Sequence, residues 1–323
     1  MNRHLVLLSI AQGLFLTNNV TFIAINGLVG LSLAPEAWMA TLPVMGYVVG
    51  GALSTGLVAK SQQRFGRKGS FQLGLLVALL SAALGAFAVL SQSFWLLVTA
   101  TVVAGYYSAN GQLYRFAAAE LCQPDYREKA VSLVMAGGLI GAVIGPNLAI
   151  QTKSILGMPF AGAYVALMVV AVLSMAVMSF ITFPPAPVVK ADDTGGRPLG
   201  EIMRQPVFVV AAMAAALGYG VMNLLMAATP LAMQVCGLSF EDTGWVLEWH
   251  VIGMFAPGFV TGHLIKRFGV LPIMGVGVLL NIACIAVALS GVDLHQFLWS
   301  MFLLGVGWNF LFTGSTTLSM QAY

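Results

Sequence analysis

The sequence predicts an all-α polytopic membrane protein, and three observations carry that prediction. Of its 323 residues, 59% are hydrophobic and only 8% are charged, whereas soluble domains carry about 25% charged residues. Apolar runs long enough to cross a bilayer recur along the whole chain. These runs lack the alternating segments of about 10 residues that a membrane β-barrel shows. A cytosolic enzyme, a nucleic-acid-binding protein and a secreted disulfide scaffold are therefore excluded.

A window of about 20 apolar residues predicts ten membrane-spanning helices. The first begins just after Arg3 and His4 and is too long for the apolar core of a cleavable signal peptide. Glycine and proline inside the runs are compatible with membrane helices. The predicted spans are residues 5–31, 38–59, 70–90, 94–117, 130–152, 160–183, 207–233, 243–265, 270–290 and 296–319.

The basic residues predict the orientation of these helices, because cytoplasmic loops are enriched in Lys and Arg. With the N-terminus inside, all 14 basic residues except Lys153 lie in cytoplasmic loops or at the inner ends of helices. We therefore expect a multi-pass protein of the cell inner membrane with a cytoplasmic N-terminus. The net charge of +3 follows from this topology and does not indicate an acidic partner such as nucleic acid.

The chain divides into two halves around its longest polar stretch, residues 184–205, which is rich in proline, glycine and aspartate and is typical of a linker. This division predicts a six-helix bundle over residues 1–183, a cytoplasmic linker over 184–205, and a four-helix bundle over 206–323. Residues 64–66 and 267–269 both spell Arg-Phe-Gly, and each copy follows the second span of its half. Repeated halves are a sequence sign of a transporter built from two bundles.

At these motifs the sequence resembles the major facilitator superfamily. The family's loop after the second helix usually has the pattern G-x-x-x-D-R-x-G-R-R/K. Residues 59–68 keep its basic half but have Ala59 and Gln63 at the Gly and Asp positions, and the second copy has Lys266 at the Asp position. The resemblance implies a latch between neighbouring helices on the cytoplasmic side. Without the carboxylate, we expect this latch to use hydrogen bonds of Gln63 or contacts of arginines with helix ends. The residues of this gating motif are Gln63, Arg64, Gly66, Arg67, Lys68, Arg267 and Gly269.

A second motif lies in the fifth span, where Gly137, Gly141, Gly145 and Pro146 follow a spacing of four. This spacing puts the glycines on one helix face, where close packing and a bend can both occur. The run resembles the family's fifth-helix motif, which is often associated with antiporters. Plain helix packing is the alternative interpretation.

The resemblance implies twelve helices, six in each half, and the sequence predicts six plus four. We expect that the chain is a fragment, truncated after the tenth helix. The alternative is that ten helices suffice.

In the superfamily the first and fourth helices of each half line the central path. The first span carries Gln12, Asn19 and Asn26 at a spacing of seven, which aligns them in one stripe. Amides are costly against lipid, so this stripe is expected to face a cavity or, alternatively, an interhelical hydrogen-bond seam. The other three helices add amides, hydroxyls and aromatic rings with almost no charge. These candidate path residues are Tyr106, Asn110, Tyr114, Tyr219, Asn223, Trp308, Asn309 and Thr313.

Two ionisable residues, Glu248 and His250, lie inside the eighth span. Charged side chains in a bilayer are costly, which makes both residues candidates for proton coupling. A separation of two turns a helix by about 200°, so they cannot share one face.

The sequence contains neither H-E-x-x-H nor G-x-S-x-G, and its three cysteines form no C-x-x-C pair. We therefore expect no enzyme activity, no metal and no cofactor. Residues 248–269 resemble those of transporters grouped with bacterial riboflavin carriers. The prediction is a monomeric secondary active transporter in the lipid bilayer that moves a small, neutral, aromatic or amphiphilic solute, with protons as the candidate coupling ion. Drug efflux and a truncated, non-transporting relic are the alternatives.

Overall fold

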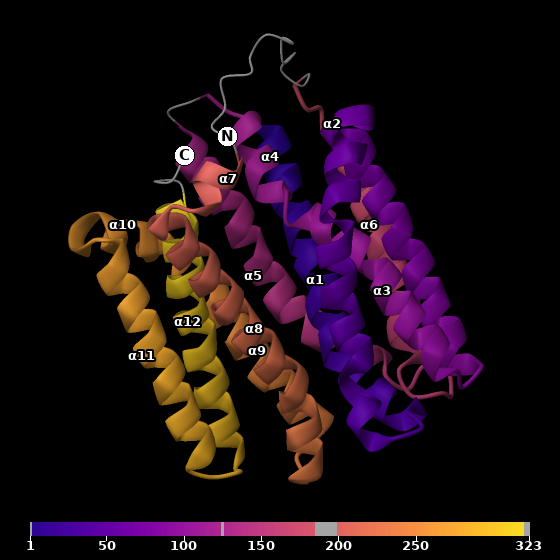
Figure 1. The fold of residues 1–323 in the computed structure, drawn as a ribbon. Helices are drawn as coiled ribbons and strands as arrows, with labels where there is room; N and C mark the ends of the chain where they lie inside the picture. The colour runs from indigo at the N-terminus through magenta and orange to yellow at the C-terminus, as the bar shows by residue number, and fades with distance from the viewer. Residues whose placement is uncertain (1, 124–125, 185–198, 320–323) are drawn as a thin grey trace. The chain divides into compact units, whose positions relative to one another are not determined.

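The computed structural model describes residues 2–123, 126–184 and 199–319, so most of the predicted linker lies outside the described residues. All regular structure in these ranges is helical (Figure 1). The elements are α1 (Arg3–Leu33), η1 (Ala37–Thr41), α2 (Leu42–Leu90), α3 (Phe94–Gly111), α4 (Tyr114–Glu120), α5 (Arg127–Thr152), α6 (Ala161–Ser179), α7 (Leu199–Met203), α8 (Pro206–Val235), α9 (Phe240–Phe255), α10 (Gly258–Phe268), α11 (Val270–Leu289) and α12 (Leu294–Ser319).

Seven helices in the described part of the chain are long and apolar enough to cross a membrane. One of them includes all of α2, which holds two predicted spans joined through Gly66. The predicted spans 94–117 and 243–265 are each interrupted, the first between α3 and α4 and the second between α9 and α10. Each predicted span thus corresponds to helix, and the all-α membrane architecture is confirmed.

The two Arg-Phe-Gly strings mark the same kind of turn in both halves. Gly66 has φ 69° within α2, and Gly269 has φ 89° between α10 and α11. Glycine adopts positive φ there without a steric penalty because it has no Cβ. In both copies the arginine guanidinium lies over the neighbouring phenylalanine ring, at 5.3 and 5.2 Å from the ring centroid. In the first copy, the loop predicted between spans 38–59 and 70–90 is therefore a hinge within α2 at Gly66.

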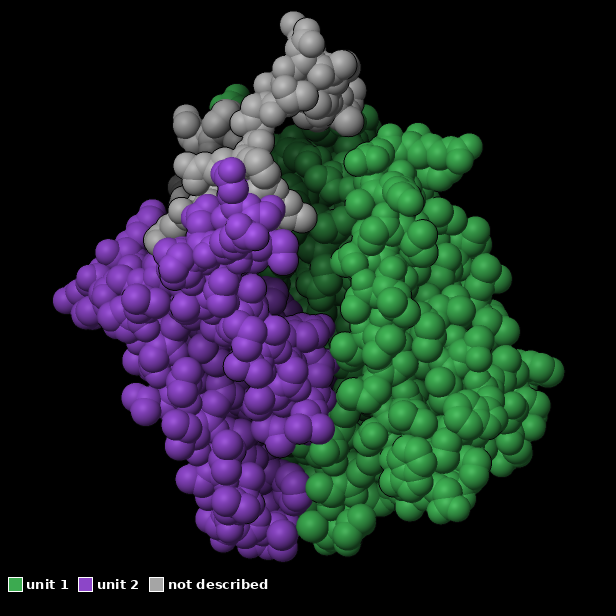
Figure 2. Space-filling model, viewed as in Figure 1, with its two compact units in different colours: residues 1–185, 227–248 green, residues 186–226, 249–323 purple. Residues whose placement is uncertain are grey.

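The described chain forms two compact units, coloured separately in Figure 2. Unit 1 contains residues 1–185 and 227–248, and unit 2 contains residues 186–226 and 249–323. Helices α8 and α9 each pass from one unit into the other. These units are defined by contacts between residues and do not follow the order of the chain. The division into bundles over residues 1–183 and 206–323 therefore stays a prediction.

Within unit 1, α1 packs against α5 and α6, and α2 packs against α3 and α6. The closest approach between α2 and α3 is at Gly50 and Gly105, where an added Cβ would lie 2.1–2.2 Å from the facing backbone. Within unit 2, α12 packs against α10 and α11. Gly277 of α11 and Gly307 of α12 meet where these two helices pack together. Small residues at these points let the helix backbones approach closely.

Candidate functional site

The three amides of α1 have different surroundings. Asn26 is fully buried, accepts a hydrogen bond from Tyr164 Oη (2.8 Å) and donates to Phe22 O (2.6 Å). Asn19 is half-buried, and its Nδ2 donates to Tyr47 Oη (2.9 Å). Gln12 is 5% exposed, and its Oε1 has no hydrogen-bond partner among the described residues. Asn26 thus lies in a seam between α1 and α6, while Gln12 keeps a free acceptor.

In α3, Tyr106 and Asn110 join a polar network with α2. Tyr106 Oη donates to Ser61 Oγ (2.9 Å), Ser70 Oγ donates to Asn110 Oδ1 (2.9 Å), and the two serine hydroxyls are hydrogen-bonded to each other. Ser61 and Ser70 lie on opposite sides of the Gly66 hinge. The network therefore ties the two arms of α2 to α3. The spacing in the sequence did not indicate that these side chains face α2.

Tyr114 lies apart from that network, in α4. Its buried ring packs edge-on against Phe15, at 5.9 Å between centroids, and against Phe71, at 4.8 Å. The structure therefore brings Tyr106 and Asn110 together but places Tyr114 in an aromatic cluster.

Unit 2 contains a second aromatic cluster. Trp308 and Phe312 stack on α12 with centroids 4.7 Å apart and an interplanar angle of 14°. Tyr219 of α8 lies 6.5 Å from Trp308, and Phe255 of α9 lies 6.3 Å from it. The indole Nε1 of Trp308 is buried without a hydrogen-bond partner among the described residues. Sequence reasoning missed Phe255, which follows no spacing shared with the other rings.

The two candidate path amides of unit 2, Asn309 and Asn223, make hydrogen bonds within that unit. Asn309 Nδ2 donates to Met254 O (2.7 Å), and its Oδ1 accepts from Thr261 Oγ1 (2.7 Å). These contacts lie at the break between α9 and α10, where Pro257 has no N–H to continue the helix. Asn223 Nδ2 donates to Tyr219 O within α8 (2.9 Å). Asn309 therefore supports the break between α9 and α10. Thr313, the last candidate path residue, lies on α12 and is half-buried.

Glu248 and His250 occupy different environments in α9. His250 is fully buried, its Nδ1 lies 2.7 Å from Met301 O, and its Nε2 has no partner among the described residues. Glu248 is half-buried. The backbone of His250 also contacts α12 closely, because a Cβ on Gly305 would lie 2.3 Å from His250 O.

At the Gly66 end, the latch has a carboxylate that the loop motif lacks. Arg67 of α2 forms an ion pair with Glu120 of α4, with Nη2 to Oε1 at 2.5 Å and Nε to Oε2 at 3.0 Å. Lys68 Nζ donates to Ser179 O at the C-terminal end of α6 (2.5 Å). The side chain of Gln63 is exposed and makes no hydrogen bond within the described residues. Sequence reasoning missed Glu120 as a latch residue. The available signal was an acidic residue just after span 94–117, on the same predicted side of the membrane as the basic loop over residues 60–68.

The second copy of the motif shares its turn and its ring contact with the first. Arg267 is exposed and lies over the Phe268 ring, and Gly269 has positive φ. Arg64 has the same arrangement in the first copy. The first copy also forms the ion pair from Arg67 to Glu120 of the neighbouring α4.

The fifth-helix glycines pack against α1. An added Cβ would lie 2.1 Å from Ser9 O at Gly137, 2.5 Å from Leu16 Cβ at Gly141 and 3.0 Å from Val20 Cβ at Gly145. Next to Pro146, the carbonyl of Gly145 accepts a hydrogen bond from Thr21 Oγ1 (2.8 Å). These contacts support the packing interpretation of the glycine run.

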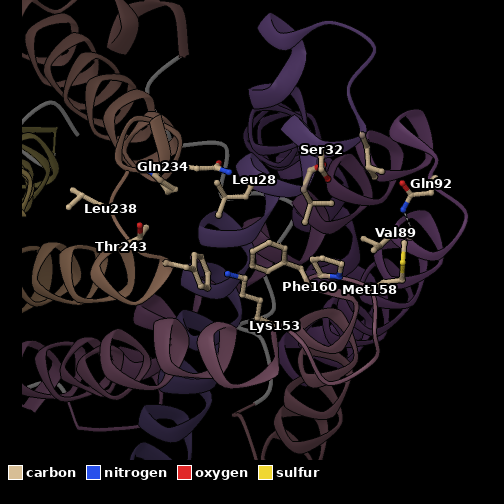
Figure 3. Close-up of a pocket in the computed structure, with 15 residues that line it drawn as sticks. Leu28, Ser32, Val89, Gln92, Lys153, Met158, Phe160, Gln234, Leu238 and Thr243 are labelled. Atoms are coloured by element: carbon tan, nitrogen blue, oxygen red, sulfur yellow. Dashed lines mark hydrogen bonds between the residues drawn. The ribbon is translucent and has the colours of Figure 1, made fainter. Parts of the chain in front are cut away.

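Unit 1 also has a cavity at the opposite end from Gly66, with a volume of about 510 Å³. The ammonium of Lys153 lies 5.7 Å from the ring centroid of Phe160 and 5.1 Å from that of Phe240. Figure 3 shows Lys153 beside Phe160, with Gln234 and Thr243 on segments from the second half of the chain. None of the predicted path residues lines this cavity.

Comparisons with known proteins agree with this architecture. A model of the Major Facilitator Superfamily matches residues 5–323. The chain is 37% identical to the riboflavin transporter RfnT of Brucella anthropi over 98% of this chain and 80% of that protein. It is 27% identical to the uncharacterized MFS-type transporter YddS of Bacillus subtilis, over 91% and 71% of the two chains. The crystal structure of a D-xylose–proton symporter matches with a TM-score of 0.73 over 99% and 86%, and at 14% identity it shows the fold alone.

Proposed function

Because this chain belongs to the Major Facilitator Superfamily of membrane transporters, we propose that it carries riboflavin, or a closely similar flat and neutral heteroaromatic solute, by alternating access. The observation that carries this proposal is the 37% identity to a riboflavin transporter over 98% of the chain. That extent of similarity includes all of the candidate path residues.

The side chains of the expected path have the chemistry for such a solute. The stacked pair Trp308 and Phe312 offers aromatic faces, and flat rings gain from offset or edge-to-face packing on such faces. Trp308 Nε1 is a buried donor without a partner among the described residues, and Gln12 Oε1 is a buried acceptor without one. A buried polar atom without a partner costs about 1–3 kcal/mol, so a solute that bonds it gains affinity. A heteroaromatic ring with carbonyl and N–H groups on its rim can accept from a donor such as Trp308 Nε1, or donate to an acceptor such as Gln12 Oε1.

The hinges and the latch supply the parts that a moving carrier needs. Gly66 and Gly269 provide equivalent turns in the two halves of the chain. The ion pair between Arg67 and Glu120 and the contact of Lys68 with the end of α6 hold the Gly66 end of unit 1 together. We propose that these contacts stabilise one of the two access states, with the Gly66 end in the cytoplasm as the positive-inside rule predicts.

Proton coupling is the second element of the proposal. Glu248 is a half-buried carboxylate in α9, and His250 is a buried imidazole whose Nε2 has no partner among the described residues. Both are ionisable groups within a predicted span, where their charged forms are costly to bury. Transport of riboflavin without coupling leaves the rest of the proposal intact.

The test is uptake of radiolabelled riboflavin into proteoliposomes that contain the purified protein. We expect saturable uptake that excess unlabelled riboflavin inhibits, and at least a tenfold loss in Trp308→Leu. The matched control is Trp95→Leu, because Trp95 is an exposed tryptophan on unit 1. Uptake of cationic drugs without uptake of riboflavin would assign the protein to drug efflux. No transport of either class by folded protein would favour the non-transporting relic.

A further inference from the structure

We propose that the cavity beside Lys153 in unit 1 is a second solute site, which binds a flat heteroaromatic ring with carbonyl acceptors on its rim. The inference rests on the proposed function for the choice of ring to probe. The cavity is separate from the expected central path, since it is formed by the far ends of α1, α8 and α9 and by the connections after α2 and α5. Its volume of about 510 Å³ lies within the range of small-molecule sites.

The first argument is the state of the Lys153 ammonium. Lys153 as a residue is half-buried, and no carboxylate or hydrogen-bond acceptor of the described residues contacts its ammonium. The rings of Phe160 and Phe240 attract it through their faces. An ammonium nevertheless has three N–H donors, and these have no strong acceptor within the described chain. A ring carbonyl placed in the cavity would accept from them.

The second argument is the backbone around the cavity. Among the described residues, only Gln92 and Phe160 have positive φ without being glycine, at 53° and 67°. Both line this cavity. Bulky side chains rarely adopt this conformation, and residues held in it cluster at ligand clamps and other functional sites. The N–H of Phe160 donates to Lys153 O (2.7 Å), so the strained turn also positions the lysine.

The third argument is how the opposite wall is held. A capping box fixes the start of α9, with Asp242 N donating to Ser239 Oγ (3.0 Å) and Ser239 N donating to Asp242 Oδ2 (3.1 Å). This cap places Phe240 edge-on to Phe160, with centroids 5.2 Å apart. Gln234 is exposed at the same wall and its side chain makes no hydrogen bond within the described chain, so its side-chain amide is available to a ligand. The rings, the cation and the amide thus surround one space (Figure 3).

The experiment measures protection of an engineered cysteine in the cavity. Ser32 lines the cavity and is exposed, so Ser32→Cys is made in a background in which Cys122 and Cys236 are replaced by serine. The rate of alkylation by N-ethylmaleimide is followed by mass spectrometry on purified protein, with riboflavin, its bare ring system lumichrome, or inorganic phosphate added. We expect riboflavin and lumichrome to slow alkylation and phosphate to have no effect. Lys153→Gln should weaken the protection constant roughly threefold to tenfold, and Lys153→Arg should retain it.

Each other outcome has a defined meaning. If neither ring compound protects the engineered thiol at position 32 in folded protein, or if Lys153→Gln leaves protection unchanged, the inference is wrong. Protection by phosphate alone would make the cavity an anion site and also overturn it. Uptake measured on the same variants keeps the two proposals separate. Riboflavin transport without protection refutes only this site, and protection without transport refutes only the proposed function.

Discussion

Arg67 in α2 and Glu120 in α4 form an ion pair beside the Gly66 hinge, with Arg67 Nη2 2.5 Å from Glu120 Oε1. Their side chains are 26% and 38% exposed. An exposed pair of this kind contributes about 0.2–1 kcal/mol. The contact is too weak to lock the bundle permanently, and this suits a latch that opens in every transport cycle.

The first prediction concerns this latch. Arg67→Gln and Glu120→Gln should each lower the melting temperature of the purified protein by about 1–3 °C and change the initial uptake rate a few-fold. The double variant should be no worse than either single one, because the same interaction is lost. Lys60→Gln is the control, since Lys60 is an exposed neighbour without such a partner among the described residues. Additive effects in the double variant would show that the two residues act independently.

The second prediction concerns the hinges. Gly66→Ala should destabilise the protein by about 1–2 kcal/mol, because L-residues are strained at positive φ. No atom lies within 4 Å of an added Cβ at Gly66, so the effect is conformational and not steric. Gly56 of the same helix also has open space but no positive φ, and Gly56→Ala should be neutral or slightly stabilising. Thermal unfolding of both variants tests this, and equal melting temperatures would argue against a strained hinge.

The third prediction separates two amides of the α1 stripe. Asn19→Leu should abolish transport while the protein stays folded, because Asn19 is half-buried and loses one hydrogen bond to Tyr47. Asn26→Leu should instead lower the free energy of unfolding by about 1–3 kcal/mol, because it leaves the buried hydroxyl of Tyr164 without its acceptor. Tyr164→Phe in the Asn26→Leu background should recover part of that stability. Normal uptake by Asn19→Leu would assign the stripe to helix packing.

The fourth prediction concerns topology. The three cysteines are free, Cys236 is exposed, Cys122 is partly exposed and Cys284 is buried. In intact cells an impermeant thiol reagent should label Cys236, and it should label Cys122 only in inverted vesicles. Cys236→Ser and Cys122→Ser identify each signal. Labelling of Cys236 in inverted vesicles alone would reverse the orientation predicted from the basic residues.

The fifth prediction concerns coupling. If Glu248 carries the proton, Glu248→Gln should exchange solute downhill yet no longer respond to a pH gradient, because its amide stays neutral at every pH. His250→Gln tests the second candidate, whose buried imidazole has no partner at Nε2 among the described residues. Uptake is compared with and without an imposed gradient in proteoliposomes. Full gradient-driven uptake by both variants would exclude both residues as the coupling site.

The sequence alone determined the fold class, the apolar segments that form helices and the equivalence of the two Arg-Phe-Gly turns, but not the breaks within spans 94–117 and 243–265. A long apolar run in a bilayer must satisfy its backbone internally, so composition and length suffice to predict a helix. Positive φ at Gly66 and Gly269 is likewise a local property that glycine permits.

Only the tertiary structure decided which side chains meet. Glu120 reaches Arg67, and Phe240 reaches Phe160 from 80 residues away. Such pairs depend on the axial register and rotation of one helix against another. That register is set by close backbone contacts such as Gly50 with Gly105 and by the breaks and turns between helices, and no local pattern encodes it.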